Sequence, residues 1–197
     1  QVKEKMMENK KPASFATGKK AVITAHTVFH PISSGCNVIG IIEGSDPELK
    51  KEVIIIGGHL DGVGYLGEVL PGALDNASGV ANIMAAAKAF SMSPNSPKRT
   101  IMFLFIGGEE CGLLGSTFYC KNPVFPLENT VAYFNLDMVG TGSGLSVGGI
   151  DSFPRIRSCF TDANDSYIHR PFRSSEYRSP GVGRPRSDAV IFKRAGV

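Results

Sequence analysis

Three runs of apolar residues stand out along the chain, at 53–56 (VIII), 101–106 (IMFLFI) and 131–134 (VAYF), and polar or glycine residues follow each of them. Continuous apolar runs rich in β-branched and aromatic residues are typical of strands that are buried on both faces of a sheet. Shorter β-rich segments are predicted at 37–44 (NVIGIIEG) and 20–25 (KAVITA). These segments predict the strands of the fold.

Between the first two runs, residues 75–90 are predicted to form a helix, because their apolar positions recur on one helical face. These positions are Val80, Ile83, Met84, Ala87 and Phe90, and Asn76 or Ser78 can cap the helix. Further helices are predicted at 112–120 and 152–165. Strands that alternate with helices indicate an α/β fold, with a largely parallel sheet between helical layers.

Composition narrows the class of protein without deciding its function. The chain has 197 residues, 42% of them apolar and 20% charged, with a net charge of +3, which is ordinary for one sizeable globular domain. No apolar run approaches the roughly 18 residues of a membrane span, so none is predicted. No nucleic-acid-binding motif accompanies the basic residues, and no nucleic-acid partner is predicted. The four cysteines lack CxxC spacing, which argues against a thiolate zinc site.

Acidic and histidine residues follow the apolar runs at matched places. In sheets of this kind, ligands bind outside the carboxyl ends of the strands. The residues at these ends are His59 and Asp61, then Glu109 and Glu110, then Asp137, while Asp75 lies just before the long helix. Three separate strands therefore deliver carboxylate or imidazole groups to one edge of the predicted sheet.

Five carboxylates and one imidazole at one edge would repel each other unless a cation lies between them. Histidine with carboxylates suits zinc, although manganese or cobalt could also bind. Each residue also has a structural interpretation of its own. His59 could be a buried structural histidine, Asp75 part of a helix cap and Asp137 a turn residue, while one of Glu109 and Glu110 could face water and the other favour a helix N-terminus. The metal hypothesis accounts for all of them together.

Four motifs in this order carry a family resemblance: GGHLD, GALDNASGVA, GGEECGLLGS and NLDMVG. They resemble the motifs of the co-catalytic two-zinc aminopeptidase family, the leucyl aminopeptidase-like zinc exopeptidases related to carboxypeptidases and glutaminyl cyclases. The resemblance runs from about Asn37 to Asp188. It implies a three-layer α/β/α sandwich with a mixed, mostly parallel central sheet, and a zinc-dependent aminopeptidase that acts on peptides outside the cell or in the periplasm.

The resemblance also implies a domain plan and a set of metal ligands. Residues 1–20 would be a linker or the exit from a preceding domain, and residues 21–197 a catalytic domain that is incomplete at its C-terminus. His59 and Asp137 would hold one zinc, Glu110 the other, and Asp75 would bridge both.

The catalytic roles implied by the resemblance fall on Glu109 and Asp61. Glu109 would be the general base for a metal-bound water, and Asp61 would hydrogen-bond His59 and orient its ring. The family's last motif is Ser-Asp-His, whose histidine completes the second metal site. In this chain the matching stretch is RSDAVIF, and Ala189 takes the place of the histidine. The second zinc is therefore expected to be weak or absent.

Two alternatives to the aminopeptidase hypothesis remain open. One is a catalytically impaired or non-catalytic member of the family that serves as a binding or scaffold domain, which the loss of a ligand at Ala189 favours. The other is a single-zinc acyltransferase like the glutaminyl cyclases. The number of metal ions per chain would separate these hypotheses.

Overall fold

The computed structural model describes residues 6, 16–26, 28, 33–65, 67–176 and 187–197. The chain divides into two compact units, Gln1–Ser33 and Ser34–Val197. In the first unit, residues 16–26 form no strand, and Val22 and Ile23 are about 90% exposed. The strand predicted at 20–25 is therefore wrong. The segment has the composition of a strand, but no other described segment of its unit pairs with it, and a lone strand is not stable in water. Most of the predicted linker 1–20 lies outside the described residues.

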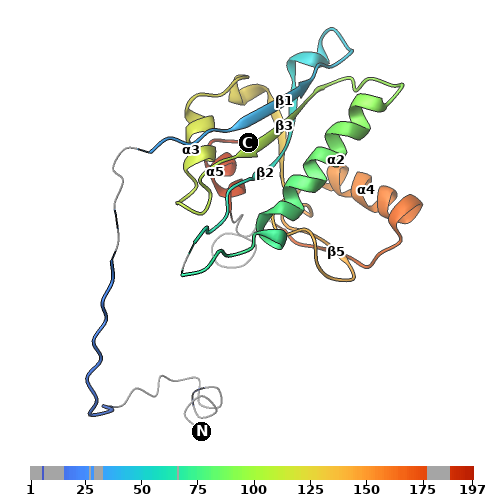
Figure 1. Cartoon of the computed structure of the whole chain (residues 1–197). Helices are drawn as coiled ribbons and strands as arrows, with labels where there is room; N and C mark the ends of the chain where they lie inside the picture. Colours follow the sequence, from blue (N-terminus) through green and yellow to red (C-terminus); the bar gives the residue numbers. More distant parts are fainter. Residues whose placement is uncertain (1–5, 7–15, 27, 29–32, 66, 177–186) are drawn as a thin grey trace. The chain divides into compact units, whose positions relative to one another are not determined.

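The second unit is built on a four-stranded sheet in the order β1–β3–β2–β4 (Figure 1). Its strands are β1 (Val38–Ile42), β2 (Val53–His59), β3 (Thr100–Ile106) and β4 (Thr130–Asn135). β2 runs parallel to both β3 and β4, whereas β1 runs antiparallel to β3. The three apolar runs and the segment 37–44 thus form the sheet, and the predicted strands are confirmed there.

The helices of this unit that the structure describes are α2 (Ser78–Met92), α3 (Leu114–Lys121), α4 (Pro154–Ala163) and α5 (Ala189–Arg194). The first three were predicted from the sequence, and the fourth, α5, was not. Short turns of 3-10 or π helix lie at η1 (Leu49–Lys51), η2 (Ala73–Ala77), η3 (Leu127–Asn129) and η4 (Asn164–Ile168). A small parallel sheet pairs β5 (Leu145–Val147) with β6 (Phe172–Ser174). None of the helices in the described ranges is long and apolar enough to cross a membrane.

Helix α2 covers one face of the main sheet. Its Ile83 is fully buried and packs with Ile101 and Phe103 of β3, and Phe90 joins the same cluster. Met84 was predicted on this face, but its side chain is 60% exposed. Met84 follows Ile83 by one residue and so lies about 100° further round the helix, outside the narrow strip that meets the sheet.

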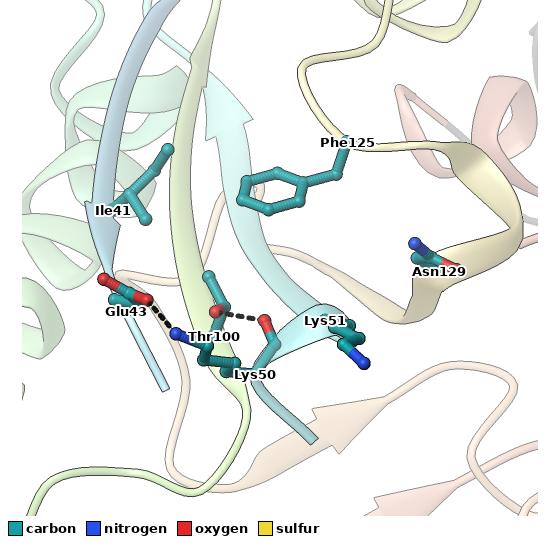
Figure 2. A pocket seen from close by; sticks show the side chains of 7 residues that line it. All are labelled: Ile41, Glu43, Lys50, Lys51, Thr100, Phe125 and Asn129. Carbon is teal, nitrogen blue, oxygen red and sulfur yellow. Dashed lines mark hydrogen bonds and ion pairs between the residues drawn. The ribbon is translucent and has the colours of Figure 1, made fainter. Parts of the chain in front are cut away.

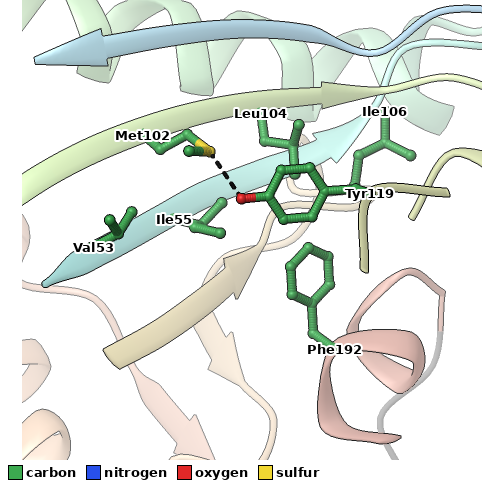
Figure 3. Close-up of a cluster of buried hydrophobic side chains, with 7 residues drawn as sticks. All are labelled: Val53, Ile55, Met102, Leu104, Ile106, Tyr119 and Phe192. Atoms are coloured by element: carbon green, nitrogen blue, oxygen red, sulfur yellow. Dashed lines mark hydrogen bonds between the residues drawn. The ribbon is translucent and has the colours of Figure 1, made fainter. Parts of the chain in front are cut away.

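Helices α3 and α5 cover the opposite face, where seven side chains form the larger core (Figure 3). They are Val53, Ile55, Met102, Leu104, Ile106, Tyr119 and Phe192. The Phe192 ring stacks on Tyr133, with ring centroids 3.8 Å apart, and the Tyr119 hydroxyl donates to the Met102 sulfur at 3.4 Å. Helices on both faces of a mixed, mostly parallel sheet make a three-layer α/β/α sandwich, as predicted.

The parallel arrangement of β3, β2 and β4 decides where the candidate residues meet. His59 is the last residue of β2, while β3 ends at Ile106 and β4 at Asn135. Because parallel strands end at the same edge of a sheet, the segments that follow β3 and β4 emerge beside His59.

Candidate metal centre

His59 lies at the centre of the predicted site, and its side chain is only 1% exposed. Its Nε2 atom is 3.1 Å from Oδ1 of Asp75 and 3.4 Å from Oδ1 of Asp137. Its Nδ1 atom faces the main-chain oxygen of Asp61 at 3.1 Å. A proton on Nδ1 that is donated to this carbonyl leaves the Nε2 lone pair directed at the two carboxylates, which is the tautomer that a metal ligand needs.

The first group of donor atoms comes from His59, Asp75 and Asp137, and the three atoms all lie within 4.8 Å of one another. Two ligands of one zinc ion, each bound at about 2 Å, are at most about 4 Å apart. The 3.1 and 3.4 Å contacts of His59 meet this limit. One imidazole nitrogen and two carboxylate oxygens are donors that zinc accepts, so this group fits one ion.

A second group consists of His59, Glu109 and Glu110, whose donor atoms also lie within 4.8 Å of one another. The family resemblance implies that Asp75 links the two ions, but in the structure His59 is the residue that both groups share. Burial, followed by the charges of Asp75 and Glu109, raises the pKa of Glu110 above its usual value. A cation between these carboxylates would offset the repulsion that Glu110 meets from them.

Asp61 connects the two groups. Its carboxylate accepts the main-chain N–H of Glu109 on Oδ1 and that of Glu110 on Oδ2, both at 3.1 Å. The same carboxylate is 3.7 Å from Nδ1 of His59, further than the main-chain oxygen of Asp61. The predicted contact with His59 is therefore made by the Asp61 carbonyl, while the side chain orients the loop that carries the two glutamates.

Burial opposes protonation of His59, but the Asp137 carboxylate, the Asp61 carbonyl and the charge of Glu109 outweigh it and raise the pKa of His59 above 6.5. A proton at Nε2 competes with a metal ion for the same lone pair. Metal affinity at this histidine should therefore fall as the pH falls through its raised pKa.

The sequence did not point to Asn37 as a part of this site. Its Nδ2 donates to the main-chain oxygen of Gly115 at 2.9 Å, and its Oδ1 accepts the N–H of Gly107 at 3.1 Å. These two bonds close the base of the loop that holds Glu109 and Glu110. The only signal in the sequence was an asparagine directly before an apolar strand, a pattern too common to indicate a functional site.

Ala189 is the first residue of α5 and offers no atom to a metal. Its neighbour Asp188 is fully buried, and neither of its carboxylate oxygens has a hydrogen-bond partner among the described residues. Burial raises the pKa of Asp188 to about 6, against the opposing effect of the nearby Ser116 hydroxyl. Within the described ranges, neither donor group includes Asp188.

A hollow of about 420 Å³ lies at the other end of the sheet, near the amino ends of β2, β3 and β4 (Figure 2). Its lining residues are Ile41, Glu43, Lys50, Lys51, Thr100, Phe125 and Asn129. The Lys50 ammonium is paired with Glu43 at 2.8 Å, and the Thr100 hydroxyl donates to the Lys50 carbonyl at 2.7 Å. These polar groups are therefore paired with one another, and the hollow lies at the end of the sheet opposite to His59.

Known proteins are similar to this chain in sequence and in fold. The chain is 33% identical over 167 residues to leupeptin-inactivating enzyme 1 of Streptomyces exfoliatus. This match covers 84% of this chain and 35% of that protein. It is also 33% identical over 142 residues to a probable leucine aminopeptidase 2 of Aspergillus oryzae, covering 66% of this chain and 27% of that protein. The chain thus spans about a third of the length of these relatives.

The fold is also similar to that of a zinc aminopeptidase from Bacillus subtilis, with a TM-score of 0.64 and 30% identity. The match covers 81% of this chain and 37% of the Bacillus chain. Residues 37–197 match the model of peptidase family M28, a range that contains the four motifs and both donor groups. The chain belongs to peptidase family M28.

Proposed function

We propose that the protein is a zinc-dependent aminopeptidase, which removes N-terminal residues from peptides. The observation that carries this proposal is the convergence of Asp75 and Asp137 on Nε2 of His59. Membership of the M28 family and the zinc aminopeptidase fold support it. A location outside the cell or in the periplasm is part of the same proposal and rests on the family resemblance alone.

His59, Asp75 and Asp137 would hold one zinc ion, and Glu110 would contribute to a second. When bound, zinc polarises a carbonyl group and makes water a stronger acid at neutral pH. Glu109 takes the proton of the attacking water and then delivers it to the leaving amine, as a general base and acid. Its place beside Glu110, with both N–H groups held by Asp61, fixes Glu109 at the edge of the donor atoms.

The two metal positions are unequal in this proposal. The first has three donor residues, whereas the second shares His59 with the first, and Ala189 stands where the family has a further histidine. We infer that one ion binds firmly and the other weakly. The absent ligand also favours a second candidate function, a non-catalytic binding or scaffold domain. A single-zinc acyltransferase like the glutaminyl cyclases stays a lesser alternative.

Two matched variants test the proposal. Glu109→Gln should keep its zinc but lose about 10²–10⁴-fold in turnover, which is the usual contribution of a general base. Glu110→Gln should instead lower the zinc content at limiting zinc. Glu128→Gln, which changes an exposed glutamate of η3, is the control and should alter neither quantity. Zinc content by elemental analysis and hydrolysis of aminoacyl-p-nitroanilides measure the two effects.

The outcomes separate the candidate functions. About one or two zinc ions per chain with aminoacyl hydrolysis supports the aminopeptidase. Bound zinc without hydrolysis, but with cyclisation of an N-terminal glutaminyl peptide, supports the acyltransferase. A chain that binds no zinc and hydrolyses nothing supports the scaffold, and equal turnover in the parent and Glu109→Gln removes Glu109 from the mechanism.

A further inference from the structure

Asn76 is a buried amide next to the candidate ligand Asp75, and its side chain is 2% exposed. Its Nδ2 donates to the main-chain oxygens of His59 at 3.1 Å and Leu136 at 2.9 Å. Its Oδ1 accepts the main-chain N–H groups of Gly79 and Met138, both at 3.1 Å. An amide side chain has two N–H donors and two acceptor lone pairs, so Asn76 uses its full capacity.

The partners of Asn76 all belong to segments that carry the first donor group. One partner is His59 itself, and two others, Leu136 and Met138, flank Asp137 on either side. Asn76 is also bonded covalently to Asp75. The Asn76 side chain is therefore bonded to the main chain of His59 and to both neighbours of Asp137, while its own backbone continues from Asp75. The bond to Gly79 adds the first turn of α2, which is the capping role that the sequence predicted.

Asn76 also bridges a place where the sheet provides no bonds. The ladder between β2 and β4 ends with Gly57 opposite Asn135, and Leu136 donates its N–H to the Gly57 oxygen at 2.7 Å. Beyond this point the carbonyls of His59 and Leu136 both accept from the Asn76 amide. The spacing between the segments of His59 and Asp137 is thus set by the width of one carboxamide.

Two glycines leave room for this amide. A Cβ atom at Gly79 would lie 2.5 Å from Oδ1 of Asn76 and 2.3 Å from the Leu136 oxygen. A Cβ atom at Gly58 would lie 2.3 Å from the same Leu136 oxygen and 3.2 Å from Nδ2 of Asn76. The backbone around Asn76 is therefore packed closely enough to hold the amide in one orientation.

We propose that Asn76 is the positioning residue of the first metal position, and that its four main-chain bonds hold His59, Asp75 and Asp137 at the separation one ion requires. This inference rests on the proposed function, because it assumes that the group binds a metal. Aspartate has the shape of asparagine but no N–H to donate, so it would place carboxylate oxygen against two carbonyl oxygens. Alanine would leave all four main-chain groups without their partner.

The test compares Asn76→Asp and Asn76→Ala with the parent chain. Zinc affinity is measured by competition with a chromophoric chelator, in protein shown to be folded by circular dichroism. Both variants should bind the tighter ion about 10–100-fold more weakly, the usual effect of losing a residue that orients metal ligands. The absorption bands of bound Co²⁺, which report ligand geometry, should change in any variant that still binds the ion.

The control is Asn164→Ala. Asn164 is 6% exposed and makes two bonds to the main chain of Arg170, at 2.9 and 3.1 Å, away from the donor residues. Its loss should lower the urea midpoint but leave zinc affinity and the Co²⁺ spectrum unchanged. In the parent, zinc should also shift the side-chain amide resonances of Asn76 but not those of Asn164, a measurement that does not depend on any variant folding.

Each outcome supports or overturns the positioning role of Asn76. Weaker zinc binding in the Asn76 variants, together with unchanged binding in Asn164→Ala, supports the inference. Equal weakening in all three variants means that general destabilisation is the cause and overturns it. Parent-like affinity in folded Asn76→Asp, or Asn76 resonances that do not respond to zinc, overturns it while the metal site stands. A parent chain that binds no zinc overturns the proposed function and the inference together.

Discussion

Asp188 allows a quantitative test of the structure that needs neither metal nor substrate. The residue is fully buried, and its carboxylate oxygens have no hydrogen-bond partner in the part of the chain that the structure describes. Its pKa is raised from 3.8 to about 6. The folded state therefore binds the proton more tightly than the unfolded state does. The contribution of Asp188 to stability is therefore most favourable at low pH, falls as the pH rises through the interval between these values, and levels off above about 6.

The size of the effect follows from the two pKa values. One pKa unit corresponds to about 1.4 kcal/mol, so ionised Asp188 destabilises the fold by about 1 kcal/mol at pH 4.5 and about 3 kcal/mol at pH 7. Asp188→Asn removes the charge and keeps the shape. A buried amide without a partner has a cost of its own, about 1–3 kcal/mol, but that cost does not depend on pH. The free-energy difference between variant and parent should therefore move by about 2 kcal/mol in favour of the variant between pH 4.5 and 7.

Urea unfolding followed by circular dichroism at several pH values measures this difference. A chelator is present throughout, so that metal binding does not contribute. Other carboxyl groups titrate in both proteins and cancel in the comparison. Asp162→Asn, which removes an exposed charge from α4, is the control and should stay within about 0.5 kcal/mol of the parent at every pH. A difference between Asp188→Asn and the parent that is flat from pH 4.5 to 7 would refute the reasoning.

Two further predictions concern the metal site and its packing. Ala189→His should raise the zinc content from about one ion to two and increase aminoacyl hydrolysis, because it restores a ligand of the second position; unchanged metal content would contradict this. Gly79→Ala should lower the free energy of unfolding, measured in urea, by about 1–3 kcal/mol even though alanine favours helices, because the new Cβ would meet the Leu136 oxygen at 2.3 Å. A stabilised Gly79→Ala would show that the contact is looser than described.

The sequence predicted the strands and helices that are specified by local pattern. The runs at 53–56 and 101–106 became β2 and β3, because their continuous apolar residues face helices on both sides. The run at 20–25 has similar composition but forms no strand. A strand needs a partner that the local sequence does not specify. The prediction that Met84 lies on the buried face was wrong for a related reason. The width of the buried strip on α2 depends on the sheet against which the helix packs.

In the candidate site too, some features could be predicted from the sequence and others depend on contacts between distant segments. Parallel topology was enough to bring His59, Asp75 and Asp137 to one edge. The contacts of Asn76 could not be predicted, because an asparagine before a helix is typical of a cap, and its remaining bonds depend on which strands lie side by side. The hydrogen bond that His59 donates to the main-chain oxygen of Asp61 could not be predicted either, because a pattern of side chains says nothing of main-chain acceptors.

The position of β2 between β3 and β4 has a consequence for the kinetics of metal exchange. His59 ends a strand that pairs with β3 up to His59 itself, and on the side of β4 its carbonyl accepts the Asn76 amide, so its backbone opens only when the core opens around it. The loop of Glu109 and Glu110 is attached at its base and its tip by the side chains of Asn37 and Asp61, and it can open alone. In the proposed two-ion site, an ion held by this loop would leave by a fast local fluctuation, whereas an ion at His59, Asp75 and Asp137 would leave at a rate limited by rarer motions of the core. The two ions would then exchange on separate timescales.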